Sequence, residues 1–265
     1  MTAHSSFTSA MRGLLDLGSL KTWSVIVTIM GDLAARRGSR LSGPVLSALT
    51  DPMGLKPEAL RVAIHRLRRD GWIDSEREGR RSLYRLTPHG LSRTRSVSER
   101  IYGTEAARPS QWHILLARSA EELDALGFDN AVYLNGRTAL LPDMADASVV
   151  PPALLAWSIE PGQMPDWALA CVVSSDLENE FAALSTVLGG TLDDRFGRDW
   201  TLVQSTAFRL LVLHNWRRLI LRLGAGHESL LNKDWSGAEC RVRVGDVLSR
   251  FPRPDAAVLL AQLTP

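Results

Sequence analysis

Cationic side chains gather on one side of the segment between residues 58 and 70. At about 100° per residue, the apolar side chains of this segment share one face and must meet a core; they are Leu60, Ala63, Ile64 and Leu67. The opposite side has Arg61, His65 and Arg69 at its centre, Arg66 beside them and Arg68 on the flank. Arginine binds guanine O6 and N7 bidentately and also holds phosphates, so this segment is predicted to enter the major groove of DNA. The alternative is a solvated arginine-rich surface.

More arginines follow in a segment that reads as extended. Residues 72–77 and 82–87 are predicted strands, and residues 78–81, with Gly79 at the turn, join them into a hairpin. The hairpin carries Arg77, Arg80, Arg81 and Arg85, which are expected to reach the flanking phosphates. Trp72 and Tyr84 are expected to pack within the hairpin rather than to stack on bases.

Three predicted helices position these side chains. Residues 23–36 have apolar residues three and four apart, residues 45–49 form a short helix with Ser42 as its cap, and residues 56–70 form a third helix that Pro57 opens. Three helices followed by a two-stranded ribbon predict a winged helix-turn-helix, in which the third helix reads the DNA and the ribbon contacts the backbone.

The charge distribution supports a polyanionic partner for this region. The 265 residues suggest about two domains, and 45% hydrophobic residues exclude wholesale disorder. Residues 1–104 hold 17 Lys and Arg against 9 Asp and Glu, whereas the remainder holds 14 against 20. Random charge drift is the alternative. Two cysteines make no disulfide framework, no apolar run is long enough for a membrane span, and residues 1–20 do not read as a secretion signal, so a cytoplasmic protein is expected.

The rest of the chain reads as a compact α+β region followed by helices. Residues 91–102 are a basic helix or linker, and 103–109 form a boundary. Strands are predicted at 112–117, 131–134, 138–141, 154–159 and 169–173, with a hairpin turn at Asn135-Gly136 and a short helix at 120–126. Helices are predicted at 177–188, 204–223, 242–251 and 256–263.

One polar sector interrupts the apolar helix predicted at residues 208–223. It contains His214, Arg217, Arg218 and Arg222, and three guanidinium groups on one face could bind an anion. The alternative is a solvated face, or ion pairs with the carboxylates of this acidic part of the chain.

No motif points to catalysis. The sequence has no nucleophile elbow, phosphate-binding glycine loop or zinc motif, and its six histidines lack metal-ligand spacing. The acidic pairs Asp193-Asp194 and Asp143 with Asp146 are expected to be solvated or capping. We therefore predict no enzyme, no catalytic residue, no metal and no cofactor. A metal-dependent nuclease and a winged helix used for protein contacts stay open as alternatives.

Residues 54–90 also resemble a known family. The stretches Ala59-Leu60-Arg61-Val62-Ala63, Asp70-Gly71-Trp72 and 78–88, together with Leu213–Arg218 and Asp234-Trp235-Ser236-Gly237, resemble the PaaX family of phenylacetate-catabolism repressors. The resemblance implies a winged-helix head (1–104), a ferredoxin-like α+β middle domain (105–195) and a helical C-terminal domain (196–265). The chain departs from the family at residues 223–228, where family members tend to carry prolines and this sequence has none.

The resemblance also implies a function. It implies a repressor of aromatic-catabolism genes that binds double-stranded operator DNA and is released by an aryl-CoA thioester such as phenylacetyl-CoA. The polar sector at His214, Arg217, Arg218 and Arg222 would then hold the effector phosphates. Two-fold operators are read by two-fold proteins, so a homodimer is expected.

Overall fold

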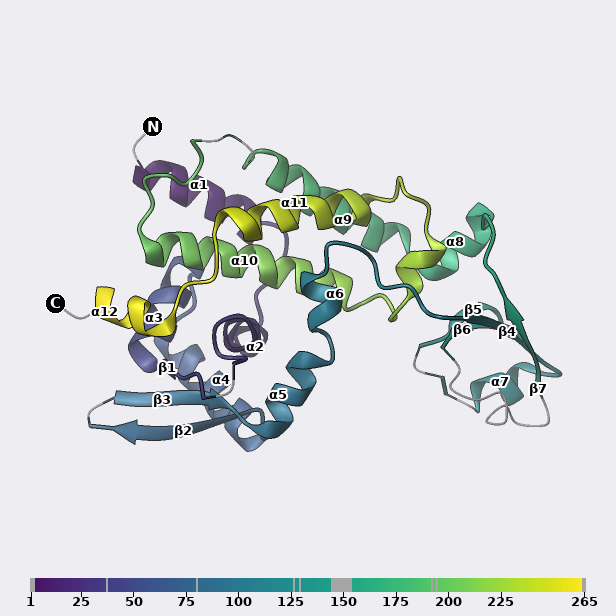
Figure 1. Ribbon diagram of the computed structural model, residues 1–265, viewed down its shortest axis with the longest axis horizontal. Coiled ribbons are helices and arrows are strands. Elements are labelled where there is room, and N and C mark those ends of the chain that lie inside the picture. Colours follow the sequence, from purple (N-terminus) through teal and green to yellow (C-terminus); the bar gives the residue numbers. More distant parts are fainter. Residues whose placement is uncertain are drawn as a thin grey trace.

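The computed structural model describes residues 3–36, 38–79, 81–125, 127–128, 130–143, 154–191, 193 and 195–263. These residues form helices and two antiparallel sheets, which confirms the predicted α+β class. In Figure 1, most helices gather around α10 (Leu202–Ile220) with the first sheet beneath them, and the second sheet protrudes on the right.

The N-terminal part contains the three predicted helices. Its elements are α1 (Ala3–Leu15), α2 (Thr22–Leu33), β1 (Leu41–Ser42), α3 (Gly43–Thr50), η1 (Asp51–Met53), α4 (Pro57–Arg69), β2 (Ile73–Glu78) and β3 (Arg81–Leu86). The Ser42 hydroxyl accepts the Val45 backbone N–H at 3.4 Å and caps α3 as predicted. Pro57 occupies the first turn of α4, where no intrahelical N–H bond is lost. The helix α1 and the short strand β1 were not predicted.

Strands β2 and β3 form the predicted hairpin. They pair antiparallel from Ile73 opposite Leu86 to Glu78 opposite Arg81, and Gly79 at the turn has φ 60°. Strand β1 pairs with β3 and completes a sheet of order β1-β3-β2. The basic segment after the hairpin forms two short helices, α5 (Pro88–Arg95) and α6 (Ser98–Tyr102). Gly90 lets α5 approach the hairpin, because a Cβ there would lie 2.2 Å from the Trp72 carbonyl oxygen.

The second sheet has the order β5-β6-β4-β7, and all its neighbouring strands are antiparallel. Its strands are β4 (Trp112–Ala117), β5 (Val132–Asn135), β6 (Thr138–Pro142) and β7 (Leu154–Ile159), with α7 (Ala120–Asp124) after β4. These elements confirm the predicted strands at the same positions. The ferredoxin-like assignment stays a prediction, since residues 144–153, where that motif has its second helix, lie outside the described residues.

The strand predicted at residues 169–173 is wrong, because this segment is helical. Helix α8 (Asp166–Val172) buries Ala168 and Val172, which lie four residues apart as on one helix face. Val172 belongs to the small cluster of buried side chains around Trp112 and Val132 of the sheet. A short apolar run such as this one does not distinguish a strand from a helix by its period.

The C-terminal part is helical as predicted. Its elements are α9 (Ser175–Gly189), α10, η3 (His227–Leu230), α11 (Ser236–Arg250) and α12 (Ala256–Gln262). Thr201 and Gln204 form a capping box at the start of α10, which satisfies two backbone N–H groups there. Helix α9 packs against α11, although its residues fall within the range predicted for the middle domain.

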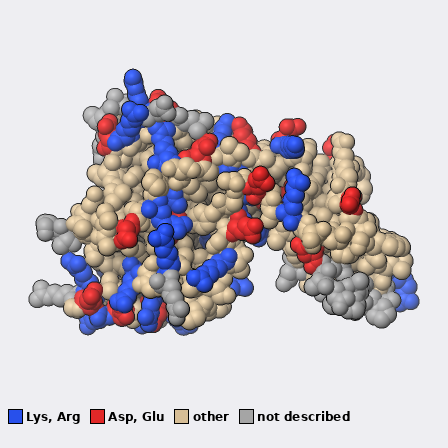
Figure 2. All heavy atoms as spheres, viewed as in Figure 1, with Lys and Arg blue, Asp and Glu red and all other residues tan. Residues whose placement is uncertain are grey.

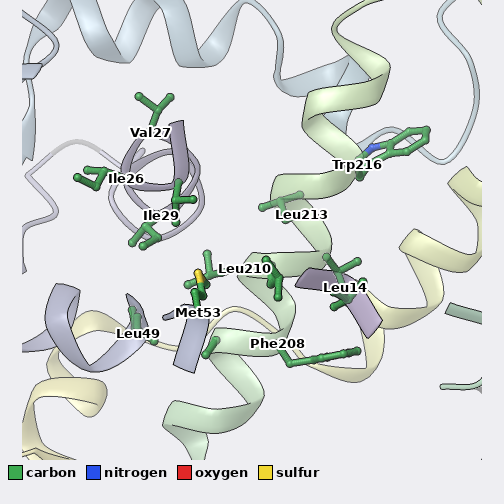
Figure 3. Packing of buried hydrophobic residues seen from close by; sticks show 14 of the residues in the cluster. Leu14, Ile26, Val27, Ile29, Leu49, Met53, Phe208, Leu210, Leu213 and Trp216 are labelled. Atoms are coloured by element: carbon green, nitrogen blue, oxygen red, sulfur yellow. The ribbon is translucent and has the colours of Figure 1, made fainter. Parts of the chain in front are cut away.

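One apolar core joins the N-terminal and C-terminal helices. A single cluster of buried residues contains members of α1, α2, α3 and α4 together with members of α9, α10 and α11. Figure 3 shows this packing, with Phe208, Leu210 and Leu213 of α10 in the same cluster as Ile26 and Ile29 of α2. The position of α4 relative to α10 is therefore set by shared packing.

Candidate nucleic-acid interface

Helix α4 has one buried face and one cationic face. Its predicted core residues Leu60, Ala63, Ile64 and Leu67 are all buried. The side chains of the predicted DNA-reading face are all exposed: Arg61, His65, Arg66, Arg68 and Arg69. The structure therefore brings these five residues together on one surface, as the helical wheel predicts.

Two carboxylates near this face, Glu58 and Asp70, pair with three of its four arginines. Arg66 and Arg69 both lie 3.4 Å from Asp70, so one carboxylate serves two guanidinium groups, and Arg61 lies 3.6 Å from Glu58. All of these groups are well exposed, and exposed ion pairs contribute little and yield to a polyanion. The Arg66 guanidinium also lies 5.5 Å from the Trp23 ring centroid, a cation–π contact that orients it.

The hairpin adds exposed arginines next to this helix. Arg77, Arg81 and Arg85 are exposed, and Arg80 lies outside the described residues. Arg85 donates to Asp74 at 3.0 Å, and this hydrogen bond lowers the pKa of Asp74. Trp72 and Tyr84 pack against the main core, which confirms their predicted structural role. Figure 2 shows Lys and Arg side chains gathered over the lower left of the molecule, where Figure 1 places the hairpin and α4, with some carboxylates among them.

The polar sector of α10 is divided between two neighbouring helices. His214 is buried and its Nδ1 lies 3.3 Å from the Thr28 hydroxyl of α2. Burial, followed by the nearby charges of Arg217 and Arg218, lowers the pKa of His214 to about 4. Arg217 donates to the Ser24 hydroxyl at 3.3 Å, also on α2.

The other two arginines of this sector face α9. Arg218 pairs with Glu180 at 2.6 Å, and Arg222 pairs with the second oxygen of the same carboxylate. For these two residues, the alternative of ion pairs within the acidic part of the chain is the arrangement observed. One carboxylate again serves two guanidinium groups, so a positive charge stays uncompensated by this pair.

A buried ionic cluster ties α2 to α10. Asp32 and Arg209 are 1% and 4% exposed, and Arg209 donates to both Asp32 oxygens, Nε to Oδ2 at 2.8 Å and one terminal nitrogen to Oδ1 at 3.0 Å. Tyr102 and Arg253 also donate to Asp32, at 2.9 and 3.1 Å. Burial alone would raise the pKa of Asp32, but the hydrogen bonds and charge of Arg209, with those of Arg253 and Tyr102, outweigh it and lower this pKa.

A second cluster holds the connection between α6 and the second sheet. Arg241 of α11 pairs with Glu228 of η3 and donates to the backbone carbonyls of Arg100 and Gly103, at 3.1 and 2.9 Å. Arg100 in turn donates to the carbonyls of Ile220 and Leu223. Neither cluster was predicted, although a charged residue inside an apolar helix, such as Asp32 or Arg209, is a signal that could have been followed.

Within the described ranges, no group of three or more His, Cys, Asp and Glu side chains could hold a metal ion, and no helix is long and apolar enough to span a membrane. The Asp143 carboxylate accepts from the backbone N–H and the hydroxyl of Ser110, just before β4, at 2.6 and 2.7 Å. Asp146 and Asp194, the partners in the two acidic pairs, lie outside the described residues.

This chain is similar to a known family and to two known proteins. Residues 21–90, which span α2 to the start of α5, match the family model described as PaaX-like protein. The chain is 26% identical to the Transcriptional repressor PaaX of Escherichia coli (strain K12), over 82% of this chain and 76% of that protein. It also shares a fold with an uncharacterized protein of Mycobacterium tuberculosis, with a TM-score of 0.51, 21% identity and coverage of 93% and 100% of the two chains. The resemblance seen in residues 54–90 is therefore confirmed, and the N-terminal part of the chain is similar to the PaaX family.

Proposed function

We propose that this protein is a transcriptional repressor that binds duplex DNA through α4 and the β2-β3 hairpin. In this proposal the N-terminal part is a winged helix-turn-helix: α4 enters the major groove, and the hairpin lies on the adjacent phosphates. The similarity to a transcriptional repressor supports the proposal. Two copies of the chain would bind the two halves of an operator.

The observation that carries this proposal is the exposed cationic surface. Four arginines of α4 and three of the hairpin point to solvent, and their ion pairs are exposed and share few carboxylates. Each arginine that contacts a phosphate releases condensed counterions from the DNA, so binding to such a surface depends steeply on salt.

The affinity for duplex DNA is expected to fall with salt, with a slope of log affinity against log salt near −5 if about six arginines contact phosphates. Fluorescence anisotropy with a labelled duplex over a series of salt concentrations measures this slope. A slope near zero contradicts the docking of this surface on DNA. The same duplex incubated with Mg²⁺ or Mn²⁺ is expected to stay whole, whereas a nuclease would cut it.

We propose further that an aryl-CoA thioester releases the protein from operators of aromatic-catabolism genes. The polar sector of α10 supports an anion site only in part, because His214 is buried and uncharged near neutral pH. Arg222 is the most open member, with 44% of its side chain exposed, and it shares Glu180 with Arg218. A thioester phosphate would compete with that carboxylate for both guanidinium groups.

Phenylacetyl-CoA at about 100 times its Kd is expected to stabilise the folded protein by about 2.7 kcal/mol, which raises Tm by several degrees. Arg222→Ala is expected to reduce this shift at the same concentration, because it removes a charge-assisted contact. Thermal-shift measurements test both statements, with Arg118→Ala, at a position just after β4, as the control. An equal shift for Arg222→Ala and the unaltered protein would remove the polar sector from the proposal.

A further inference from the structure

The outermost line of α4 contains a residue that the charge pattern does not explain. The buried residues of α4 define the inner side of the helix, and at about 100° per residue the positions directly opposite are Glu58, Val62, His65 and Arg69. All four are exposed. Val62 therefore lies in the middle of the surface that faces away from the core, with Arg61 and Arg66 on its two sides.

Val62 is 70% exposed, a larger fraction than for any other large apolar side chain that the structure describes as exposed. A single exposed valine on a protein surface is ordinary. This one, however, lies at the centre of the proposed DNA-reading face, and its β-branched side chain is a poor choice for an exposed helix position. Neither the core nor helix propensity accounts for valine here.

The chemistry of the major groove supplies a partner for such a side chain. Base edges in this groove present hydrogen-bond donors and acceptors, together with one apolar group, the 5-methyl of thymine. The arginines around Val62 suit guanine edges and phosphates, but an isopropyl group can make no hydrogen bond. Its χ1 is restricted in a helix, so little conformational entropy is lost when it packs.

We infer that Val62 determines specificity by packing against the 5-methyl group of a thymine in each half-site. This inference rests on the proposed DNA binding and adds to it the base feature that is read. Removal of one methyl from such a contact is expected to weaken binding about fourfold.

The test begins with selection of a duplex from a randomised pool by the full-length protein. Each thymine of the selected site is then replaced, one at a time, by deoxyuridine, which lacks only the methyl group. Kd is measured by anisotropy at one salt concentration for the unaltered protein, Val62→Ala and Val242→Ala. Val242, on α11, is a matched control because it is a valine that is 60% exposed outside the proposed interface.

The unaltered protein and Val242→Ala are expected to lose about fourfold in affinity when one particular thymine of a half-site is replaced. Val62→Ala is expected to bind the thymine site about as weakly as the unaltered protein binds the uracil site, and to lose nothing more on replacement. Alanine is a better helix former than valine, so the variant is expected to fold, which circular dichroism checks. If the protein binds DNA but no thymine replacement distinguishes the unaltered protein from Val62→Ala, the inference alone is overturned. If the protein retains no duplex at all, the proposed function is overturned and the inference with it.

Discussion

Replacing Asp32 by alanine is expected to lower the free energy of unfolding by about 3–5 kcal/mol. The substitution leaves the guanidinium of Arg209, which is 4% exposed, without its carboxylate, and it also removes the acceptor of Tyr102 and Arg253. Removal of one partner leaves a buried charge unpaired, which lowers stability strongly. Replacement of both partners by apolar residues, in contrast, changes stability little. Urea unfolding followed by circular dichroism measures the difference.

Arg118→Ala is the control for this prediction. Arg118 pairs with Glu122 at 2.7 Å, but its side chain is 87% exposed, so its loss is expected to change the free energy of unfolding by about 0.5 kcal/mol or less. A loss below about 1 kcal/mol for Asp32→Ala would show that the buried cluster does not hold α2 to α10. If that variant does not fold, Asp32→Asn keeps the side-chain shape and provides the same comparison.

The effect of Asp32 is also expected to depend on pH. Its pKa is lower in the folded protein than the ordinary 3.8, so its stabilisation is complete well above 3.8 and is lost as the pH falls through the lowered value. The difference in stability between the unaltered protein and Asp32→Asn should therefore shrink on acidification below about pH 4. The folded pKa of His214 is about 4, so this residue lowers the stability of both proteins progressively as the pH falls from 6.5 to that value. The loss is the same in both proteins and cancels in the difference.

Arg61→Ala and Arg81→Ala are expected to weaken DNA binding in different ways. Arg61, on α4, is expected to contact a base edge, so its loss should cost about 1–3 kcal/mol on the preferred site and relax sequence preference. Arg81, at the start of β3, is expected to contact phosphate. Its loss should weaken all sequences alike and reduce the salt slope by about one.

The measurement compares Kd on the selected duplex and on a scrambled duplex at several salt concentrations. The ratio of the two affinities should fall for Arg61→Ala and stay constant for Arg81→Ala. The same ratio for both variants would contradict this division between base contact and backbone contact. Both side chains are exposed, so neither variant is expected to lose stability.

The elements around the candidate interface were predictable because their signals are local. Ser42 and Pro57 mark the starts of α3 and α4, the four buried residues of α4 follow one helix period, and Gly79 marks the hairpin turn. Such signals depend on neighbours within a few residues, so the sequence carries them directly. The exposed arginines of α4 followed from the same period.

What the sequence did not reveal depends on contacts between distant segments. Strand β1 has only two residues and forms because it pairs with β3. The sequence of α8 is also compatible with a strand, and its contacts with β5 accompany the helical form. Asp32 and Arg209 are separated by 177 positions in the sequence. Glu180, which pairs with both Arg218 and Arg222, lies 38 and 42 positions from them, so the sequence did not show that these two arginines have a carboxylate partner.

The common core of the N-terminal and C-terminal helices has a consequence for protein engineering. Because α2 buries its apolar side against α10 and its aspartate against Arg209, residues 1–104 cut out by themselves would expose both to water. The N-terminal part, which carries the proposed DNA-reading face, is therefore not a transplantable module. A chimaera that exchanges the proposed binding specificity between relatives would have to carry α10 along with the N-terminal helices and the hairpin. The alternative is to replace only the outward side chains of α4.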